Sequence, residues 1–304
     1  MIDFKSVTPQ DQKLLYSFIF PGERRDSNLS IASLCCWQFL NCSSFAVIGE
    51  QLVIRFCFPD SQTVYTLPAG EKAGKQVIRL LARQAMEENL PLYIYGILPE
   101  LQERLEETFP GVFEYRDNRD HADYLYLRQD LAELKGKNYQ PKRNHVNKFR
   151  KTYDYRYTPL TTAMVQDCIL MYEQWCEDRR CMEDESLESE KQALLFGLDH
   201  FDELGLSGGA LWVEGHIVAF TFGRPVNHDT FCIHAEKALL TFEGAYNAIN
   251  WEFARRLSGS YLYLNREEDL GIPGLRKAKL SYHPFKLLEK GLAVCAEGLW
   301  DKLF

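Results

Sequence analysis

The chain has 304 residues, of which 46% are hydrophobic and 26% are charged, and its formal net charge is −8. This composition is typical of a folded globular protein and excludes a disordered one. The length favours two domains of roughly 150 residues each. The acidic total excludes a protein that coats DNA, although it leaves room for a local basic surface.

The nine cysteines are odd in number and include no Cys-x-x-Cys pair. Such usage is typical of a reduced, cytoplasmic protein with free thiols. The long uncharged stretch Ser27–Gly49 contains eight Ser, Asn or Gln residues, which is too polar for a membrane-spanning helix. Charged residues near the N-terminus stand where a signal peptide needs an apolar core. We therefore expect a cytoplasmic protein without a transmembrane segment.

Hydrophobic spacing predicts the elements of the first half of the chain. Thr8-Pro9-Gln10-Asp11 begins a helix, because it offers an N-cap residue, a proline and an acid in the preferred order. After it we predict a helix over 29–39, strands over 44–48, 52–58 and 63–67, a helix over 71–88, a strand over 92–95, a helix over 99–108, and strands over 112–115 and 124–127.

The same order of elements recurs in the second half. We predict helices over 162–178 and 187–204, strands over 209–214, 216–224 and 230–235, a helix over 244–257, a strand over 261–265, and late strands over 282–285 and 292–295. The sequence therefore predicts two similar mixed α/β domains, residues 1–130 and 131–304. Paired helices, an antiparallel meander, a helix and a further strand are also the order of the GNAT acyltransferase fold.

The segment 135–156, called here the basic strip, contains eight Lys or Arg residues and a single acid, for a net charge of +7. Five aromatic residues lie among or directly beside these cations. Cations interleaved with aromatic side chains suit contacts with the phosphates and bases of RNA. A solvated amphipathic helix between two domains accounts for the same pattern, and the residues alone leave both interpretations open.

Two further segments carry candidate chemistry. Glu236 and Lys237 end a predicted strand shortly before Glu243–Tyr246, which begins a helix, so a carboxylate there can deprotonate a nucleophile and the helix start can hold an anion. An ordinary ion pair at a sheet edge is the alternative. Asn265–Gly271 and Gly274–Tyr282 place acids, amides and then cations directly after a strand, as a polar pocket at a sheet edge requires.

Several familiar motifs are absent or incomplete. Gly70–Lys75 resembles a phosphate loop, but its glycines are one residue too close and Gln76 replaces Ser or Thr, so only a weaker anion site at a helix start stays open. Cys168, Cys176 and Cys181 lack metal-finger spacing, and no His-Glu-x-x-His occurs, so we predict no metal site. No Gly-x-Ser-x-Gly or Gly-x-Gly-x-x-Gly is present.

The chain resembles the C-terminal domain of phosphatidylglycerol lysyltransferases and its stand-alone relatives. The likeness covers about residues 20–300 and rests on Lys142–Phe149, Glu236–Lys237, Glu243–Tyr246 with Asn250, Asn265–Gly271 and Gly274–Tyr282. The resemblance implies two tandem GNAT-like domains and transfer of an aminoacyl group from aminoacyl-tRNA at a site in the second domain. The chain is also similar to the Fem-type ligases, which add amino acids to peptidoglycan precursors.

The resemblance assigns roles to individual residues. Glu236 or Asp269 is expected to orient or deprotonate the nucleophile, and Lys279, with Arg276 or Lys277, to stabilise the oxyanion or hold the donor's phosphate. The further residues expected to bind substrate are Glu243, Asn250, Asn265, Arg266, Glu267 and Tyr282. Those expected to contact tRNA or phosphate are Lys142, Arg143, Asn144, Lys148 and Arg150.

The acceptor stays open between a lipid, a peptide and a small molecule with an amine or hydroxyl. The lysyltransferases have a multi-helix membrane region that this sequence does not show, which disfavours a phospholipid. An acyl-CoA-dependent N-acyltransferase is one alternative function. However, placing Gly244 on the first glycine of the GNAT loop Gln/Arg-x-x-Gly-x-Gly/Ala puts Thr241 and Tyr246 at two of its other positions. A non-catalytic RNA- or protein-binding tandem fold is the second alternative.

Overall fold

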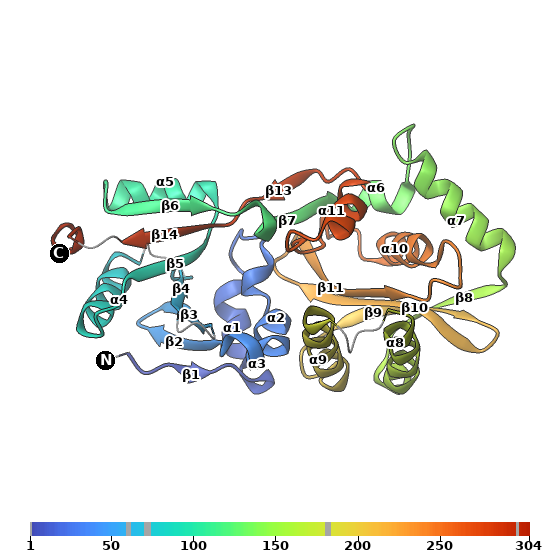
Figure 1. Cartoon of the computed structure of the whole chain (residues 1–304), viewed down its shortest axis with the longest axis horizontal. Coiled ribbons are helices and arrows are strands. Elements are labelled where there is room, and N and C mark those ends of the chain that lie inside the picture. Colours follow the sequence, from blue (N-terminus) through green and yellow to red (C-terminus); the bar gives the residue numbers. More distant parts are fainter. Residues whose placement is uncertain (1, 59–61, 70–73, 180–183, 296–297) are drawn as a thin grey trace. The chain divides into compact units, whose positions relative to one another are not determined.

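The structure is a computed structural model that describes residues 2–58, 62–69, 74–179, 184–295 and 298–304. Its chain forms two compact units (Figure 1). The first unit comprises Met1–Asp123, Glu268–Ile272 and Leu287–Phe304, and the second comprises Tyr124–Glu267 and Pro273–Lys286. These units differ from the contiguous ranges 1–130 and 131–304, because the end of the chain returns to the first unit.

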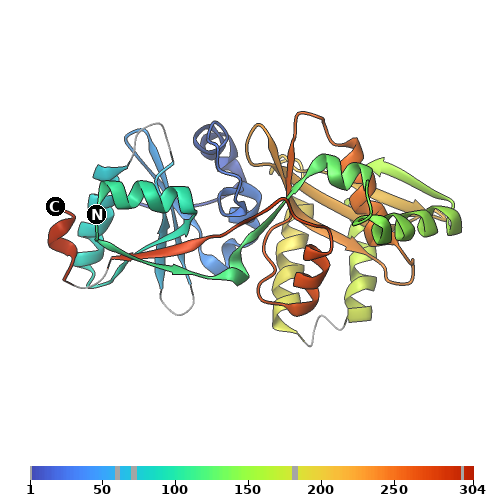
Figure 2. The ribbon, with the colours of Figure 1, turned by 90° about the horizontal axis from the view of Figure 1, so that it is seen from above.

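The first unit is built on a seven-stranded mixed sheet. Its strand order is β1 (Lys5–Ser6), β2 (Ser44–Ile48), β3 (Gln51–Cys57), β4 (Thr63–Thr66), β5 (Leu92–Ile97), β14 (Gly291–Cys295) and β6 (Phe113–Asp117). The pairs β2–β3 and β3–β4 are antiparallel, whereas β4 and β5 are parallel. The C-terminal strand β14, drawn in red, lies between β5 and β6 and pairs with both (Figure 2).

The α-helices of the first unit are α1 (Gln12–Ile19), α2 (Ile31–Cys36), α3 (Gln38–Asn41), α4 (Lys75–Glu87) and α5 (Pro99–Thr108). Short 3-10 helices cover Pro9–Asp11, Ser27–Leu29, Arg119–His121 and Trp300–Lys302. Helix α4 makes the crossover that a parallel β4–β5 pair requires. It buries Val77, Leu81 and Ala85 at helical spacing in the same core as Ile94.

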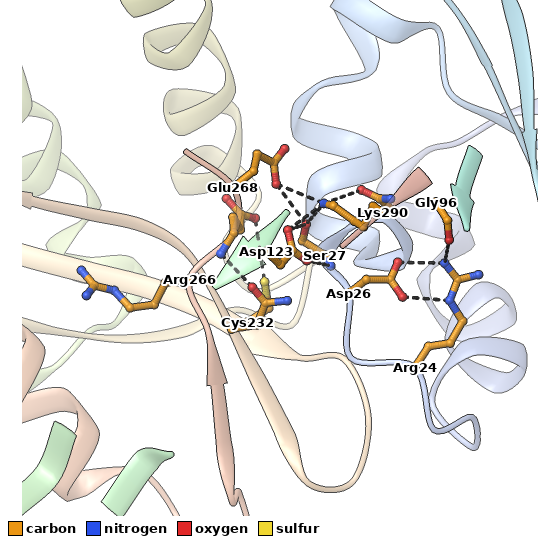
Figure 3. A network of polar contacts seen from close by, with 12 residues as sticks. Arg24, Asp26, Ser27, Gly96, Asp123, Cys232, Arg266, Glu268 and Lys290 are labelled. Atoms are coloured by element: carbon orange, nitrogen blue, oxygen red, sulfur yellow. Dashed lines mark hydrogen bonds and ion pairs between the residues drawn. The ribbon is translucent and has the colours of Figure 1, made fainter. Parts of the chain in front are cut away.

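A buried lysine connects three segments of the first unit (Figure 3). Lys290 Nζ lies 2.6 Å from Asp123 Oδ1 and 3.3 Å from Glu268 Oε2, and it donates to Ser27 Oγ at 3.3 Å. The Lys290 and Asp123 side chains are both fully buried. Burial opposes the charge of Lys290, but the two carboxylates raise its pKa well above the usual value. The residues before β14 are thus tied by charge to the N-terminal part of the chain.

The second seven-stranded sheet lies chiefly in the second unit. Its strand order is β13 (Lys286–Leu288), β7 (Asp123–Leu127), β12 (Tyr263–Asn265), β11 (Thr230–Ala238), β10 (His216–Pro225), β9 (Ser207–Val213) and β8 (Tyr155–Pro159). The strands from β8 to β11 are antiparallel neighbours, and β11–β12 is parallel. This pattern repeats that of the first sheet, and β7, like β14, comes from the other half of the chain. The predicted doubling of a mixed α/β arrangement is therefore confirmed.

The helices of the second unit are α6 (Arg128–Glu133), α7 (Gln140–Thr152), α8 (Val165–Arg179), α9 (Glu185–Asp199), α10 (Ala245–Arg256) and α11 (Pro273–Leu280). Helix α10 connects β11 to β12 and buries Ala248 and Ile249 against the sheet. Its N-cap, Gly244, has a left-handed φ of 89°, and a Cβ there would stand 2.6 Å from the carbonyl oxygen of His145 on α7. Only glycine permits so close an approach of the two helices.

Two predicted elements were wrong, and helix α11 was not predicted. The helix expected over 29–39 is divided into α2 and α3 at Trp37, whose φ and ψ of −101° and 8° depart from helical values. Over 274–281, where the sequence predicted no element, the structure has helix α11, which begins at Pro273, a favourable first helical residue. The strand expected over 282–285 does not form, because His283 adopts a left-handed φ of 52°.

Candidate active site

The carboxylate of Glu236 is the centre of a polar cluster in the second unit. Its Oε2 accepts a hydrogen bond from Asn250 Nδ2 at 3.0 Å, and its Oε1 accepts one from Arg266 Nη2 at 2.8 Å. The Glu236 side chain is 9% exposed, and Asn250 is buried. Donors on both oxygens fix the direction in which this carboxylate points.

The topology explains why these three residues meet. Strand β12 pairs with β11 only over Thr230–Cys232, whereas β11 continues to Ala238. Glu236 therefore lies on β11 beyond the stretch paired with β12, and Arg266, the first residue after β12, reaches it. Helix α10, which runs between the two strands, supplies Asn250 from its middle turn.

Arg266 is largely buried and lies against two phenol rings. Its guanidinium carbon is 4.9 Å from the centre of the Tyr282 ring and 5.6 Å from that of Tyr126. Burial acts to lower the pKa of Arg266, but the charge of Glu236 and the two phenols raise it overall, so the group is always a cation. Its Nη1 is buried and has no hydrogen-bond partner among the described residues.

Lys142, in the first turn of α7, belongs to the same cluster. Its Nζ lies 3.9 Å from the centre of the Tyr282 ring and donates to Ser281 Oγ at 2.7 Å. Burial, together with the positive charge of Arg266, lowers the pKa of Lys142 to about 8, and Glu236 acts in the opposite direction. An amine with this pKa exchanges a proton readily near neutral pH.

Tyr282 joins the two cations. Its hydroxyl accepts a hydrogen bond from Asn247 Nδ2 at 2.6 Å, and its ring faces Lys142 and Arg266. Burial raises the pKa of Tyr282, so it stays a neutral phenol. The negative face of an aromatic ring attracts positive charge, so the Tyr282 ring stabilises both cations.

Three more of the predicted residues position the segment that carries Arg266. Lys279 Nζ donates to the carbonyl oxygens of Arg266 at 2.6 Å and of Glu267 at 3.2 Å. Asn265 Oδ1 accepts a hydrogen bond from the backbone N–H of Glu267 at 2.7 Å. The Glu267 carboxylate lies 2.8 Å from His234 Nδ1. In this arrangement Lys279 holds the backbone of the segment that carries Arg266.

Other predicted site residues lie elsewhere. Asp269 belongs to the first unit, where its buried carboxylate pairs with Arg119 at 3.3 Å and accepts the backbone N–H of Gly271 at 2.9 Å. Asp269 and Glu236 belong to different units, so the catalytic role expected for Asp269 stays a prediction. Glu243 is exposed and pairs with Lys148 at 2.5 Å. On α11, Arg276 is partly buried and Lys277 is exposed.

The rest of the basic strip lies mainly on the surface of α7 and β8. Arg143 Nη1 donates to the carbonyl oxygens of Leu134 and Gly136, and Asn144 is exposed. The guanidinium carbon of Arg150 lies 5.3 Å from the Trp251 ring centre, and that of Arg156 lies 5.5 Å from the Trp212 ring centre. These exposed arginines beside indoles form a surface with which stacked bases and phosphates are compatible.

A shallow depression of about 330 Å³ adjoins this surface. Its lining residues are Arg150, Tyr153, Asp154, Tyr155, Tyr157, Glu252 and Arg256. Arg256 lies 4.3 Å from the Tyr157 ring centre and pairs with Glu252. The depression therefore joins cations and phenol rings at the C-terminal end of α7.

Sequence reasoning missed Asn247, Ser281 and Tyr126 as members of the cluster. Asn247 and Asn250 are three residues apart on α10, so the spacing i, i+3 would have placed them on one helix face. Nothing in the sequence signalled Tyr126, which reaches the site from β7 and donates its hydroxyl proton to the Lys279 carbonyl at 2.8 Å.

The Gly70–Lys75 anion site falls largely outside the described residues, as does Cys181.

The family model for the C-terminal region of phosphatidylglycerol lysyltransferase matches residues 21–293, so the chain belongs to that family. A Bacteroides thetaiotaomicron protein of unknown function is 46% identical, with a TM-score of 0.94 over 97% of this chain and 100% of the other. An uncharacterized Mycoplasmoides gallisepticum protein is 26% identical over 56% of this chain. The match spans 55% of that protein's length.

Two more distant structures have the same fold. L-PGS from Bacillus licheniformis is 16% identical, with a TM-score of 0.60 over 95% of this chain and 92% of the other. FemX is 8% identical, with a TM-score of 0.59 over 96% of this chain and 97% of the other. The fold is thus the tandem GNAT-like arrangement of two mixed sheets that the sequence predicted. The family and fold together are those of an aminoacyltransferase-like protein.

Among the described residues, every helix is too short or too polar to cross a bilayer. None of the eight described cysteines forms a disulfide bond, and six of them are buried. Burial raises the pKa of Cys168 to about 12 and that of Cys295 to about 11. These two thiols are therefore protonated and unreactive at neutral pH.

Proposed function

We propose that the protein transfers an aminoacyl group from aminoacyl-tRNA to an acceptor with an amine or hydroxyl, at the cluster of Glu236, Arg266 and Lys142. Membership of the lysyltransferase family supports the reaction class. The observation that carries the proposal is the combination of a lysine with a pKa of about 8 and a fixed carboxylate beside a buried arginine. These are the groups that acyl transfer to an amine requires.

Each group has a defined part in the proposed reaction. The acceptor nitrogen or oxygen attacks the ester carbonyl carbon, and the neutral amine of Lys142 takes the proton that the acceptor loses. Arg266 Nη1, which has no partner among the described residues, donates to the carbonyl oxygen as negative charge develops on it. The ester C–O bond then breaks, and Lys142 returns its proton to the ribose oxygen that leaves.

Asn250 and Glu236 orient the aminoacyl group. Asn250 Oδ1 is buried without a hydrogen-bond partner among the described residues, while its Nδ2 is held by Glu236. A buried acceptor beside a carboxylate is suited to the α-ammonium group of an amino acid. The exposed arginines and indoles of α7 and β8 would hold the tRNA backbone and unstacked bases, with affinity that falls as salt rises.

The decisive experiment measures transfer of a labelled amino acid from charged tRNA to an amine-bearing peptide and to vesicles that contain phosphatidylglycerol. Transfer to either acceptor is expected, and the two arms distinguish a peptide from a lipid acceptor. The Lys142→Met variant keeps the apolar stem on Tyr282 and should lose about 10²- to 10⁴-fold in rate, as expected for loss of a general base. Lys191→Met, on α9, is a matched control because Lys191 is also partly buried.

The pH profile separates the role of Lys142 from simple packing. The rate of the wild type should rise as pH increases through about 8, and the Lys142→Met variant should lose this limb. No transfer to any acceptor, together with no salt-dependent binding of tRNA, would refute the proposal. A rise in Tm with acetyl-CoA, without one for charged tRNA, would instead favour the acyl-CoA alternative.

A further inference from the structure

Three side chains next to the proposed active site bring together a thiol, an imidazole and a carboxylate. Cys232 Sγ lies 3.8 Å from His234 Nδ1 and 3.8 Å from Glu267 Oε1, and the last two atoms are 2.8 Å apart. All three belong to the second unit. They form the one group of three potential metal ligands found within the described ranges.

Two local features of the backbone accompany the close approach of these three side chains. The pairing of β10 with β11 shifts register so that Phe222 faces Ala235 while Gly223 faces Ile233, which leaves His234 as the extra residue of a bulge. A bulge changes the direction in which the side chain of its extra residue points, which here is His234. Glu267 has a left-handed φ of 56°, a conformation that costs a non-glycine residue about 1 kcal/mol or more.

The segment after β12 is held firmly in this conformation. The hydrogen bonds from Glu267 N–H to Asn265 Oδ1, and from Lys279 Nζ to the Glu267 carbonyl, fix the backbone on both sides of the Glu267 side chain. Cys232 is fully buried, His234 is 7% exposed in its side chain, and Glu267 is 24% exposed. Two ligands are therefore rigid, and the third retains some freedom and contact with solvent.

The spacing of the three atoms suits a small divalent ion. Ligand atoms around a tetrahedral zinc ion lie about 3.3 to 3.7 Å apart, given metal–ligand distances of about 2.0 to 2.3 Å. The two distances from Cys232 Sγ, 3.8 Å each, are about 0.1 Å longer than the upper end of this range. The distance between His234 and Glu267 must open by about half an ångström, which the partly exposed carboxylate permits.

We propose that Cys232 Sγ, His234 Nδ1 and the Glu267 carboxylate bind a divalent transition metal ion of the zinc class, with a fourth position open to water. The ligand types are those that zinc prefers, and three protein ligands with one open position are typical of reactive zinc sites. The ion joins β11 to the residue that follows Arg266. It thereby holds Arg266 against Glu236. This proposal does not depend on which group the enzyme transfers.

No sequence motif predicts a metal at this position, because Cys232 and His234 are separated by one residue and Glu267 follows His234 by 33 positions. Only the parallel pairing of β11 with β12 brings the third ligand to the other two. The Cys-x-His pair lies on one strand, where residues two apart commonly point the same way. A Cys-x-His on a strand is too frequent a pattern to predict a site by itself.

Titration of the full-length, metal-free protein with Co²⁺ tests the site. We expect binding of one equivalent, with visible d–d bands of tetrahedral intensity and a near-ultraviolet thiolate-to-cobalt band, both abolished by added Zn²⁺. Because the thiol and imidazole must release protons, affinity should fall as pH decreases. Absence of saturable binding, or a spectrum without the thiolate band, would overturn the proposal in favour of a purely hydrogen-bonded trio.

Variants assign the ligands. Cys232→Ser should remove the thiolate band, and Glu267→Gln should weaken Co²⁺ binding by more than about 100-fold, since loss of an outer partner alone costs 10- to 100-fold. Cys168→Ser is the matched control, because Cys168 is equally buried but lies on α8 outside the group of three. Glu267→Gln covers the case in which Cys232→Ser does not fold, since Glu267 is partly exposed. Unchanged binding in Glu267→Gln would contradict the assignment.

Discussion

Replacement of Lys290 by Met tests the charge cluster that ties β14 to the rest of the first unit. Lys290 Nζ contacts two carboxylates, Asp123 at 2.6 Å and Glu268 at 3.3 Å, and both Lys290 and Asp123 are fully buried. Methionine preserves most of the apolar stem. It removes the positive charge that lies 2.6 Å from the Asp123 carboxylate.

The expected loss in the free energy of unfolding depends on the hydrogen bonds that Asp123 keeps in the variant. Removal of one partner of a buried ion pair costs about 3 to 5 kcal/mol, because the other charge is left without compensation. Asp123 still accepts hydrogen bonds from the Ser27 backbone N–H at 2.6 Å and the Ser27 hydroxyl at 3.0 Å. We therefore expect a loss near the lower end, about 3 kcal/mol. In the thermal transition of the first unit, this lowers Tm by roughly 6 to 12 °C.

The assay is thermal and urea unfolding followed by circular dichroism, with a double variant as control. Lys290→Met combined with Asp123→Asn removes both charges and should recover part of the loss, which a double-mutant cycle quantifies. Because the folded pKa of Lys290 lies above its unfolded value, the stabilisation is complete below about pH 10 and disappears only at higher pH. A loss below about 1 kcal/mol, or no recovery in the double variant, would refute the reasoning.

Two further perturbations test the second unit. Gly244→Ala should cost about 2 kcal/mol or more, since a Cβ there meets the His145 carbonyl at 2.6 Å and φ is 89°. Gly136→Ala, at a φ of 84° but with nothing within 4 Å, should cost only the backbone strain, and equal losses in urea unfolding would contradict the predicted contact. Lys142 has a lowered folded pKa, so the wild type gains stability relative to Lys142→Met as pH rises from about 8 towards 10.5. The melting temperatures of the wild type and of Lys142→Met, measured across this pH range, test whether the difference between them increases with pH. A difference that stays constant would argue against a lowered pKa of Lys142.

Local patterns predicted most of the elements. The helix expected over 99–108 has the same bounds as α5, because Pro99 suits the first helical position and apolar residues recur at helical spacing. The two meanders were predicted for a similar reason, since alternating apolar residues between turn signals describe strands with one buried face. The strand predicted over 282–285 failed because the left-handed conformation of His283 interrupts an extended chain.

The candidate site was predicted in part. Glu236, Asn250 and Arg266 were expected to bind or transform substrate, and the structure brings all three into contact. Lys142 was expected to contact the tRNA backbone as part of the basic strip, and the structure places it on the ring of Tyr282 inside the cluster. Its charge is visible in the sequence, whereas its lowered pKa depends on burial and on the nearby charge of Arg266.

By itself, the sequence determined the doubled mixed α/β order, the family, and the residue types available for catalysis, because these depend on local periodicity and on motifs. Only the tertiary structure decided which unit each residue joins. Strands β7 and β14 each complete a sheet formed by the other half of the chain, and Asp269 lies with Arg119 in the first unit. Likewise, the parallel pairing of β11 with β12 brings Glu267 to Cys232 and His234. Such contacts join residues far apart in sequence, and no local pattern encodes that pairing.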